Sequence, residues 1–224
     1  DKAITIYQML KTESNLDALL DNEIKACMAA QQWLLNPDTL TVMKTLTCNS
    51  KGSDYAPFYD GAFLYFTTDR TGREDGETYD WTGRAFSDLW MSNKNGTKAE
   101  RMPGPFNTEN NEGTLAMTSN GEELYFTRCQ SEGAEDAFCR IMRCQRDVAK
   151  SSKPQVVEEL VGNFNVMHPS FSMDGQLMFF SSDASNGIGG KDIYFSRRGE
   201  QGWSSPVNLG QVINTEGDEA FPHV

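Results

Sequence analysis

One short pattern occurs three times along the chain, and it limits what the chain can fold into. In each copy an Asp-Gly or Asn-Gly pair precedes an apolar triplet: Leu64–Phe66, Leu124–Phe126 and Met178–Phe180. Such pairs tolerate the positive φ that a tight hairpin turn requires. We therefore predict that each triplet belongs to the second strand of a β-hairpin whose turn contains Gly61, Gly121 or Gly175.

The connections between these hairpins repeat as well. An asparagine recurs at intervals of roughly 50 to 60 residues, at four places: Asn49, Asn107, Asn165 and Asn214. A third strand is recognisable in "SDLWMS" and "KDIYFS", which contain Asp88 and Asp192. The middle copy, "CRIMRC", has no Asp. A fourth strand is clearest in "GWSSPVNLG", residues 202–210.

Four short strands in each repeat are typical of a β-propeller blade. We predict a mainly β fold, namely an incomplete β-propeller over residues 38–224 that is preceded by a short helical segment over residues 1–37. The predicted blades span about 49–106, 107–164 and 165–213, and residues 214–224 begin a fourth. A closed propeller needs about four to eight blades. We therefore expect this sequence to be a piece of a longer protein with further blades.

The first 37 residues have a helical pattern. From Asn15 to Leu35 the apolar side chains recur at the period of an α-helix. Ser14 and Asn15 are residue types that cap helices, and Asn36-Pro37 would end this one. Residues 3–10 are predicted to form an earlier helix. Because two helices bury little core, we expect the segment to be the end of a helical repeat array, or a cap on the β region.

The charge of the chain argues against two classes of partner. With 32 acidic and 20 basic residues, the net charge is −12. Such a surface repels the phosphates of nucleic acids and anionic lipid headgroups. No apolar run is long enough to cross a bilayer, and no signal peptide is recognisable. We predict no nucleic-acid binding and no direct headgroup binding.

The chain has five cysteines and no CxxC motif, which argues against a zinc ribbon or a thioredoxin-type centre. Cys129 and Cys139 could meet across a hairpin and form a disulfide if the compartment is oxidising. The alternative, free and half-buried thiols, stays open on the sequence alone.

Residue patterns that support catalysis or metal binding are few. There is no GxSxG nucleophile elbow, and the glycines of "NGIGGKD" lack the Lys-Ser/Thr ending of a phosphate-binding loop. His168 and His223 each lie beside a proline, and a metal site would need a third ligand from another loop. The acidic residues show no EF-hand spacing. We predict no catalytic, cofactor-binding or metal-binding residues.

One insertion is the strongest candidate for a binding surface. The connection over residues 73–86, "REDGETYDWTGRAF", is long, aromatic and charged. Long loops on a rigid scaffold often carry recognition, and aromatic side chains are common interface anchors. We predict that Tyr79, Trp81 and Phe86 contact a partner.

The repeat resembles the TolB-like propeller repeat known as PD40. Its fullest copy, residues 165–210, contains "PSFSMDG", "FFSSD", "GGKDIY" and "PVNLG" in that order. The resemblance covers roughly residues 38–224 and implies a propeller fold.

The junction over residues 24–57, "IKACMAAQQWLLNPDTLTVMKTLTCNSKGSDYAP", resembles a group of OmpA-family envelope lipoproteins of the Bacteroidota. These combine tetratricopeptide helices, a propeller and a peptidoglycan-binding domain, and the group includes a component of the type IX secretion system. The resemblance implies a periplasmic protein that is associated with the outer membrane through a lipid anchor outside this sequence. It implies envelope or secretion-system proteins as partners, and contact with peptidoglycan only through a domain outside these residues.

Together these features predict a non-enzymatic protein-interaction scaffold of the cell envelope that needs no cofactor. Two alternatives stay open: the regulatory propeller of a hydrolase whose catalytic domain lies outside this sequence, and a glycan-binding envelope module. A downstream GxSxG domain would favour the first alternative. Glycan binding that depends on Trp81 would favour the second.

Overall fold

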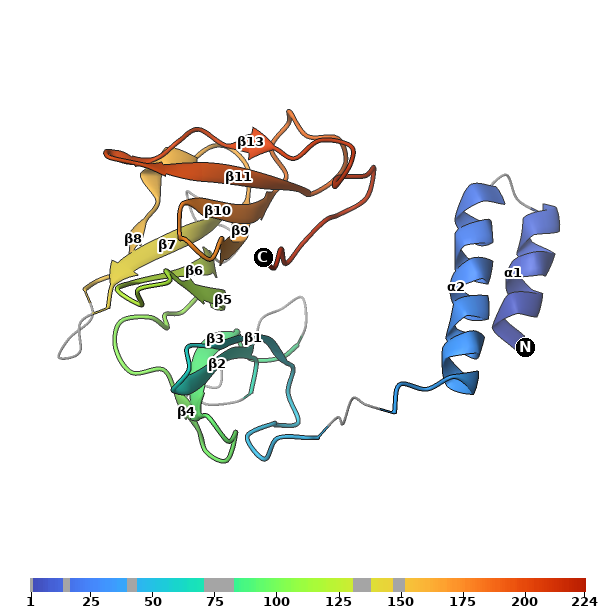
Figure 1. Cartoon of the computed structure of the whole chain (residues 1–224), viewed down its shortest axis with the longest axis horizontal. Helices are drawn as coiled ribbons and strands as arrows, with labels where there is room; N and C mark the ends of the chain where they lie inside the picture. The colour runs from blue at the N-terminus through green and yellow to red at the C-terminus, as the bar shows by residue number, and fades with distance from the viewer. Residues whose placement is uncertain (1, 14–16, 40–43, 71–82, 131–137, 147–151) are drawn as a thin grey trace. The chain divides into compact units, whose positions relative to one another are not determined.

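The computed structural model describes residues 2–13, 17–39, 44–70, 83–130, 138–146 and 152–224. The chain divides into two compact units, Asp1–Thr45 (unit 1) and Leu46–Val224 (unit 2) (Figure 1). The sequence pattern changes from helical to β-rich slightly earlier, after Pro37.

Unit 1 is a pair of helices, α1 (Lys2–Glu13) and α2 (Asp17–Leu35), that contact each other. Lys11 Nζ lies 2.6 Å from a carboxylate oxygen of Asp21 and ties the two helices together. Several apolar side chains of the pair are exposed, and Trp33 is 71% accessible. Among the described residues, no helix is both long and apolar enough to cross a bilayer.

The described residues of unit 2 form three antiparallel sheets that follow one another along the chain. Sheet 1 consists of β1 (Asp54–Tyr59), β2 (Phe63–Thr68), β3 (Asp88–Asn93) and β4 (Ala99–Arg101). Sheet 2 consists of β5 (Asn111–Met117), β6 (Glu123–Cys129), β7 (Cys139–Gln145) and β8 (Gln155–Val156). Sheet 3 consists of β9 (Val166–Phe171), β10 (Leu177–Ser182), β11 (Asp192–Gly199) and two short strands that both pair with β11, β12 (Gly202–Trp203) and β13 (Val207–Asn208).

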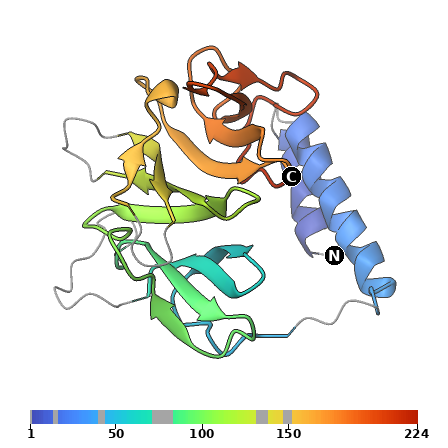
Figure 2. The ribbon, with the colours of Figure 1, turned by 60° about the vertical axis from the view of Figure 1, so that its left-hand side comes forward.

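Figures 1 and 2 show the sheets in succession, from the cyan and green strands of sheet 1 to the orange strands of sheet 3. The three apolar triplets lie in β2, β6 and β10, each the second strand of its sheet. The turn glycines Gly61, Gly121 and Gly175 have φ angles of +91°, +69° and +67°. The predicted hairpins are confirmed, and the succession of antiparallel meanders is a β-propeller-type fold.

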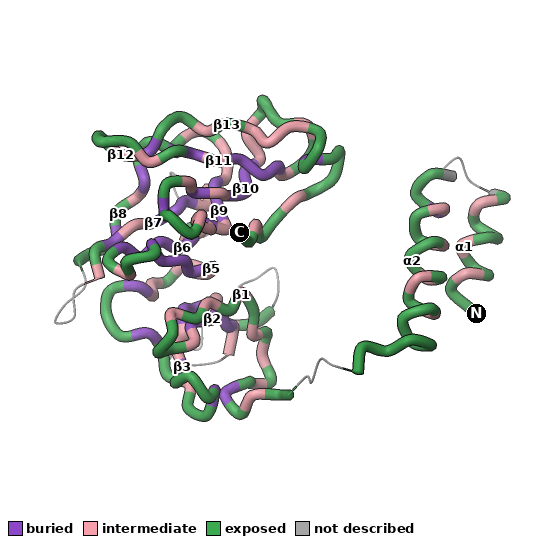
Figure 3. Tube along the Cα trace, in the orientation of Figure 1, coloured by how far each residue is buried: buried purple, intermediate pink, exposed green. Residues whose placement is uncertain are grey.

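Two hydrophobic cores lie between the sheets. Leu124 and Phe126 of β6 belong to the core that sheet 2 shares with sheet 1. Tyr125, between them in sequence, belongs to the core that sheet 2 shares with sheet 3. This division follows from the alternation of side chains along a strand. Figure 3 shows the buried residues concentrated in the strands of sheets 2 and 3.

The first strand of every sheet contains the same backbone irregularity. Among the described residues, the non-glycine residues with positive φ are Ala56, Thr114, His168 and Phe221, with values between +49° and +60°. The first three lie at register shifts in β1, β5 and β9. Non-glycine residues rarely adopt this φ. Its recurrence in β1, β5 and β9 shows that the three sheets are copies of one unit.

Candidate interaction face

Two of the recurrent asparagines join a repeat to the sheet before it in the same way. Asn107 accepts a hydrogen bond from the backbone N–H of Leu89 at 2.7 Å and donates one to its carbonyl at 3.0 Å. Asn214 makes the same two bonds with Ile193, at 2.8 and 3.0 Å. Asn49 is exposed, and its side chain makes no such bond to any described residue. Asn107 and Asn214 therefore fasten consecutive repeats to each other, and we call this pair of hydrogen bonds the asparagine lock.

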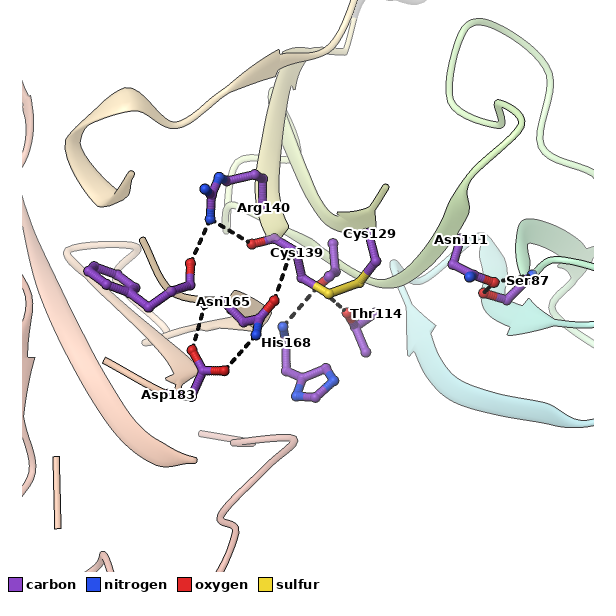
Figure 4. The surroundings of a disulfide bond; sticks show 11 residues. Ser87, Asn111, Thr114, Cys129, Cys139, Arg140, Asn165, His168 and Asp183 are labelled. Carbon is purple, nitrogen blue, oxygen red and sulfur yellow. Dashed lines mark hydrogen bonds between the residues drawn. A yellow bond between two sulfur atoms is a disulfide. The ribbon is translucent and has the colours of Figure 1, made fainter. Parts of the chain in front are cut away.

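Asn165 uses a variant of this lock (Figure 4). Its Oδ1 atom accepts a hydrogen bond from the backbone N–H of Cys139 at 2.8 Å, so it again bonds the third strand of the preceding sheet. Its own N–H groups donate to the carboxylate of Asp183. Arg140 donates to the carbonyl of Phe164, directly before the asparagine, at 2.6 Å.

The two predicted third-strand aspartates are buried and hold neighbouring strands together. Asp88 accepts hydrogen bonds from the guanidinium of Arg101 in β4, at 3.0 and 3.1 Å. Asp192 accepts one from Asn208 in β13, at 2.8 Å. Arg140 occupies the equivalent position of β7, where the sequence has no Asp. The side chains at this position therefore have a structural role, because each holds neighbouring strands or segments together.

A carboxylate lock in sheet 2 was missed by the sequence reasoning. Thr108 donates its N–H and its hydroxyl to the carboxylate of Glu112, and Arg128 Nε donates to it at 2.8 Å. Glu112 is 1% exposed. Burial raises the pKa of Glu112, against the hydrogen bonds of Thr108 and the charge of Arg128.

The same lock recurs at the start of sheet 1 and near the end of the chain, but not in sheet 3, whose first strand and the asparagine before it contain no carboxylate. In sheet 1, Ser50 donates to Asp54, and Arg70 lies 2.6 Å from that carboxylate. Near the end of the chain, the N–H and the hydroxyl of Thr215 donate to the carboxylate of Glu219. The signal was available in the sequence as "NSKGSD", "NTENNE" and "NTEGDE", an Asn-Ser/Thr pair followed by a carboxylate.

Cys129 and Cys139 face each other in the paired strands β6 and β7, and a disulfide joins them (Figure 4). They line a cleft of about 460 Å³ at the end of the sheets where the β2–β3 and β6–β7 connections lie. Across it, the N–H and hydroxyl of Ser87 donate to Asn111, at 2.9 and 3.1 Å. We call this end, with Asp69, residues 83–87 and the disulfide, the disulfide face.

Of the three residues predicted to contact a partner, Tyr79 and Trp81 lie outside the described residues. Phe86 is half-buried on the disulfide face, and its neighbours Ala85 and Ser87 line the cleft. Arg84 also lies in the described part of the insertion, and its guanidinium is 3.3 Å from the carboxylate of Asp69. The structure thus brings the end of the insertion and the disulfide to one cleft.

His168 lies in β9 where the disulfide-face cleft meets a second cleft of about 490 Å³. Its ring stacks on that of Phe221, with 4.0 Å between the centroids. Burial, together with the positive charge of Lys191, lowers the pKa of His168 to about 4. His223 is exposed. In the part of the chain that the structure describes, no three His, Cys, Asp or Glu side chains form a metal-binding group.

The strand order thus defines unit 2 as a β-propeller-type protein. No family model and no curated protein matches the chain. Among solved structures it is similar to TolB from Acinetobacter baumannii, with 14% identity over 75% of this chain and 33% of that chain and a TM-score of 0.44. A puromycin-hydrolyzing peptidase of Mycobacterium tuberculosis matches with 13% identity over 70% of this chain and 23% of that chain, at a TM-score of 0.43.

CoXyl43, a GH43 β-xylosidase/α-arabinofuranosidase from a compost microbial metagenome, matches with 8% identity over 79% of this chain and 65% of that chain, at a TM-score of 0.45. The chain spans 33% of the length of TolB and 23% of that of the peptidase. With TM-scores below 0.5, these likenesses decide nothing about activity or partners.

Proposed function

We propose that this protein is a non-enzymatic protein-interaction scaffold of the bacterial cell envelope. The observation that carries the proposal is the structural use of two buried carboxylates: Glu112 pairs with Arg128, and Asp88 pairs with Arg101, and these pairs fasten repeats and strands. These locks hold together the strands that carry the disulfide face. Loops held on a rigid scaffold are suited to recognition.

The disulfide supports a periplasmic location. Disulfides persist in oxidising compartments such as the bacterial periplasm and are rare in the cytosol. The Cys129–Cys139 bond closes the β6–β7 connection on the proposed interaction face. An association with the outer membrane, through a lipid anchor outside this sequence, is proposed from the resemblance of residues 24–57.

The same resemblance favours the PorE-type component of the type IX secretion system as the particular role. Such a component would link the secretion machinery to the outer membrane and to peptidoglycan. Its partners would be outer-membrane or periplasmic proteins of that machinery. The contact with peptidoglycan would come from a domain outside these residues, and no step of the role requires a cofactor or bond chemistry.

Site-specific photo-cross-linking in the organism that encodes the protein tests the proposal. A photoreactive amino acid replaces Arg84 on the disulfide face or, as the matched control, Lys98 just before β4; these side chains are 53% and 78% exposed. We expect cross-links to envelope proteins from position 84 and none from position 98. Equal labelling from both positions, or none from position 84, would contradict an interaction role of this face. Deletion of the gene tests the finer role, because it should block secretion of type IX cargo.

A further inference from the structure

The two sheet interfaces of unit 2 are built from equivalent parts. Gln145, at the end of β7, donates its N–H to the hydroxyl of Ser152 at 2.9 Å and accepts the Ser152 N–H at 3.1 Å. In β11, Arg197 makes the same pair of bonds with Ser204, at 3.0 and 2.8 Å. These bonds fix the correspondence between the last strands of sheets 2 and 3, residue by residue.

Between sheets 2 and 3, the residue before Ser204 fills the interface. This residue, Trp203, is 6% exposed, and its indole N–H donates to the hydroxyl of Tyr125 at 3.3 Å. Its ring centroid lies 6.2 Å from that of Tyr125 and 5.9 Å from that of Phe171. The guanidinium of Arg198 lies 5.4 Å from the indole centroid.

Between sheets 1 and 2, equivalent side chains surround a cavity. Tyr65, Met117 and Arg146 stand in the places of the tyrosine, the phenylalanine and the arginine that surround Trp203. The residue before Ser152 in the sequence is Ser151, which lies outside the described residues. The described residues leave a cavity of about 860 Å³, whose further apolar lining includes Phe58, Phe63, Met91, Met102 and Phe106.

The polar groups of this cavity lie at its rim. Arg146 donates to the hydroxyl of Tyr65 at 3.0 Å and lies 3.0 Å from the carboxylate of Asp60. The centre of its guanidinium is 5.9 Å from the centroid of the Tyr65 ring. Glu122, also at the rim, is exposed and accepts a hydrogen bond from Asn120. The lining of the cavity therefore includes both the guanidinium of Arg146 and the exposed carboxylate of Glu122.

We propose that this cavity binds an aromatic side chain, an indole above all, that a protein partner presents beside a basic residue. This inference rests on the proposed scaffold function and gives the chemistry of the partner. The indole would take the place that Trp203 takes in the other interface, edge-on to Tyr65, beside the sulfur of Met117 and below Arg146. The exposed carboxylate of Glu122 would pair with the basic neighbour.

Methionine-methyl NMR of the intact 224-residue chain tests the inference, because three methionines line the cavity. The probe is N-acetyl-Lys-Trp-amide, and N-acetyl-Lys-Leu-amide is the matched control. We expect ring-current shifts of the methyl signals of Met91, Met102 and Met117, with millimolar affinity, and none for Met173, which is exposed elsewhere on unit 2. The leucine peptide should leave all of these signals in place.

Variants locate the site and separate its parts. Arg146→Ala should weaken binding of the tryptophan peptide by roughly three- to tenfold through loss of the cation–π contact. Arg197→Ala removes an arginine of β11 outside the cavity and should leave affinity unchanged. Glu122→Gln should remove the preference, roughly two- to threefold, for N-acetyl-Lys-Trp-amide over N-acetyl-Glu-Trp-amide. Trp203→Ala should create a second site for the probe, reported by Met178.

The inference is overturned if the cavity methionines do not shift at saturating probe, or if the leucine peptide moves them equally. It is also overturned if they shift with protein concentration alone, because a second copy of the chain would then be the occupant. The cross-linking experiment uses another face and whole cells. Its failure would remove the scaffold function and leave the peptide measurement as an independent result.

Discussion

Between sheets 2 and 3, Trp203 closes the interface below Arg198, whereas between sheets 1 and 2 a cavity lies below Arg146. The backbones of the two regions correspond through identical serine bonds and identical bulges. A repeated architecture therefore fixes where side chains stand, and the residues at equivalent positions, together with the packing of their neighbours, decide whether an interface is filled or hollow. A cavity costs stability, and such departures from close packing are expected at functional sites.

Trp203→Ala gives the largest expected effect, because it should convert the filled interface into the hollow one. Removal of a buried tryptophan costs about 3–5 kcal/mol in the free energy of unfolding. Chemical denaturation of the variant and the wild type measures the change. Trp33→Ala, at an exposed position of α2, is the control and should change stability by less than about 0.5 kcal/mol. Equal effects of the two substitutions would break the comparison between the interfaces.

Loss of the disulfide comes next, because the bond braces sheet 2, the sheet that both interfaces share. Cys129→Ala with Cys139→Ala should lower the free energy of unfolding by about 2–4 kcal/mol, mainly by loosening the constraint on the unfolded chain. Reduction of the wild-type protein should reproduce the loss. Cys27→Ala, at a half-buried free cysteine of unit 1, provides the matched control. Insensitivity of the wild type to reductant would show that the cysteines do not pair in solution.

The sequence predicts the repeat because the features that define it are local. The turn glycines, the apolar triplets and the asparagines each report a backbone conformation or a strand within a few residues. The segments "NTENNE" and "NTEGDE" also contain the pattern of the carboxylate lock. The lock was not predicted, because acidic residues in loops are usually solvated. Glu219, in the second of these segments, accepts two hydrogen bonds from Thr215.

The cavity could not be predicted in the same way, although part of its signal is in the sequence. Setting "SSKPQV" beside "WSSPVN" shows a tryptophan in one repeat and none in the other. Whether a missing side chain leaves a cavity depends on how far the neighbours collapse into the space. That outcome depends on Tyr65, Met117 and Arg146, which come from three separate strands or their ends. Single-sequence reasoning has no access to such long-range packing.

The asparagine locks provide a matched pair for the interface between sheets 1 and 2. Asn107→Ala should cost about 1–3 kcal/mol, because the N–H of the buried residue Leu89 would lose its partner and the carbonyl would keep only the N–H of Met102. Asn49→Ala removes the equivalent asparagine where it is exposed and should cost less than about 0.5 kcal/mol. Thermal and chemical unfolding of both variants decide the point. A costly Asn49→Ala would show that the exposed asparagine has a role that the lock does not explain.

The smallest expected effect concerns pH and belongs to the interface between sheets 2 and 3. The bulge of sheet 2 contains Thr114, which does not titrate, whereas the bulge of sheet 3 contains His168, which does. Burial, together with the positive charge of Lys191, lowers the pKa of His168 from an ordinary 6.5 to about 4. Between these values the unfolded chain binds the proton more strongly, so stability present above pH 6.5 is lost as the pH falls towards 4. Because the ring is partly solvated, we expect a loss on the order of 1–2 kcal/mol between about pH 7 and pH 4.5.

Denaturation curves across this pH range measure that loss. His168→Gln should flatten the acid side of the stability profile, since the variant has no imidazole to protonate at this position. His223→Gln, at an exposed histidine, should keep the wild-type profile. If the wild type and His168→Gln lose stability in parallel on acidification, the histidine of β9 is not what distinguishes the two interfaces at low pH. The acid sensitivity would then come from other titrating groups, among them the carboxylates of Asp54 and Glu112 in sheets 1 and 2.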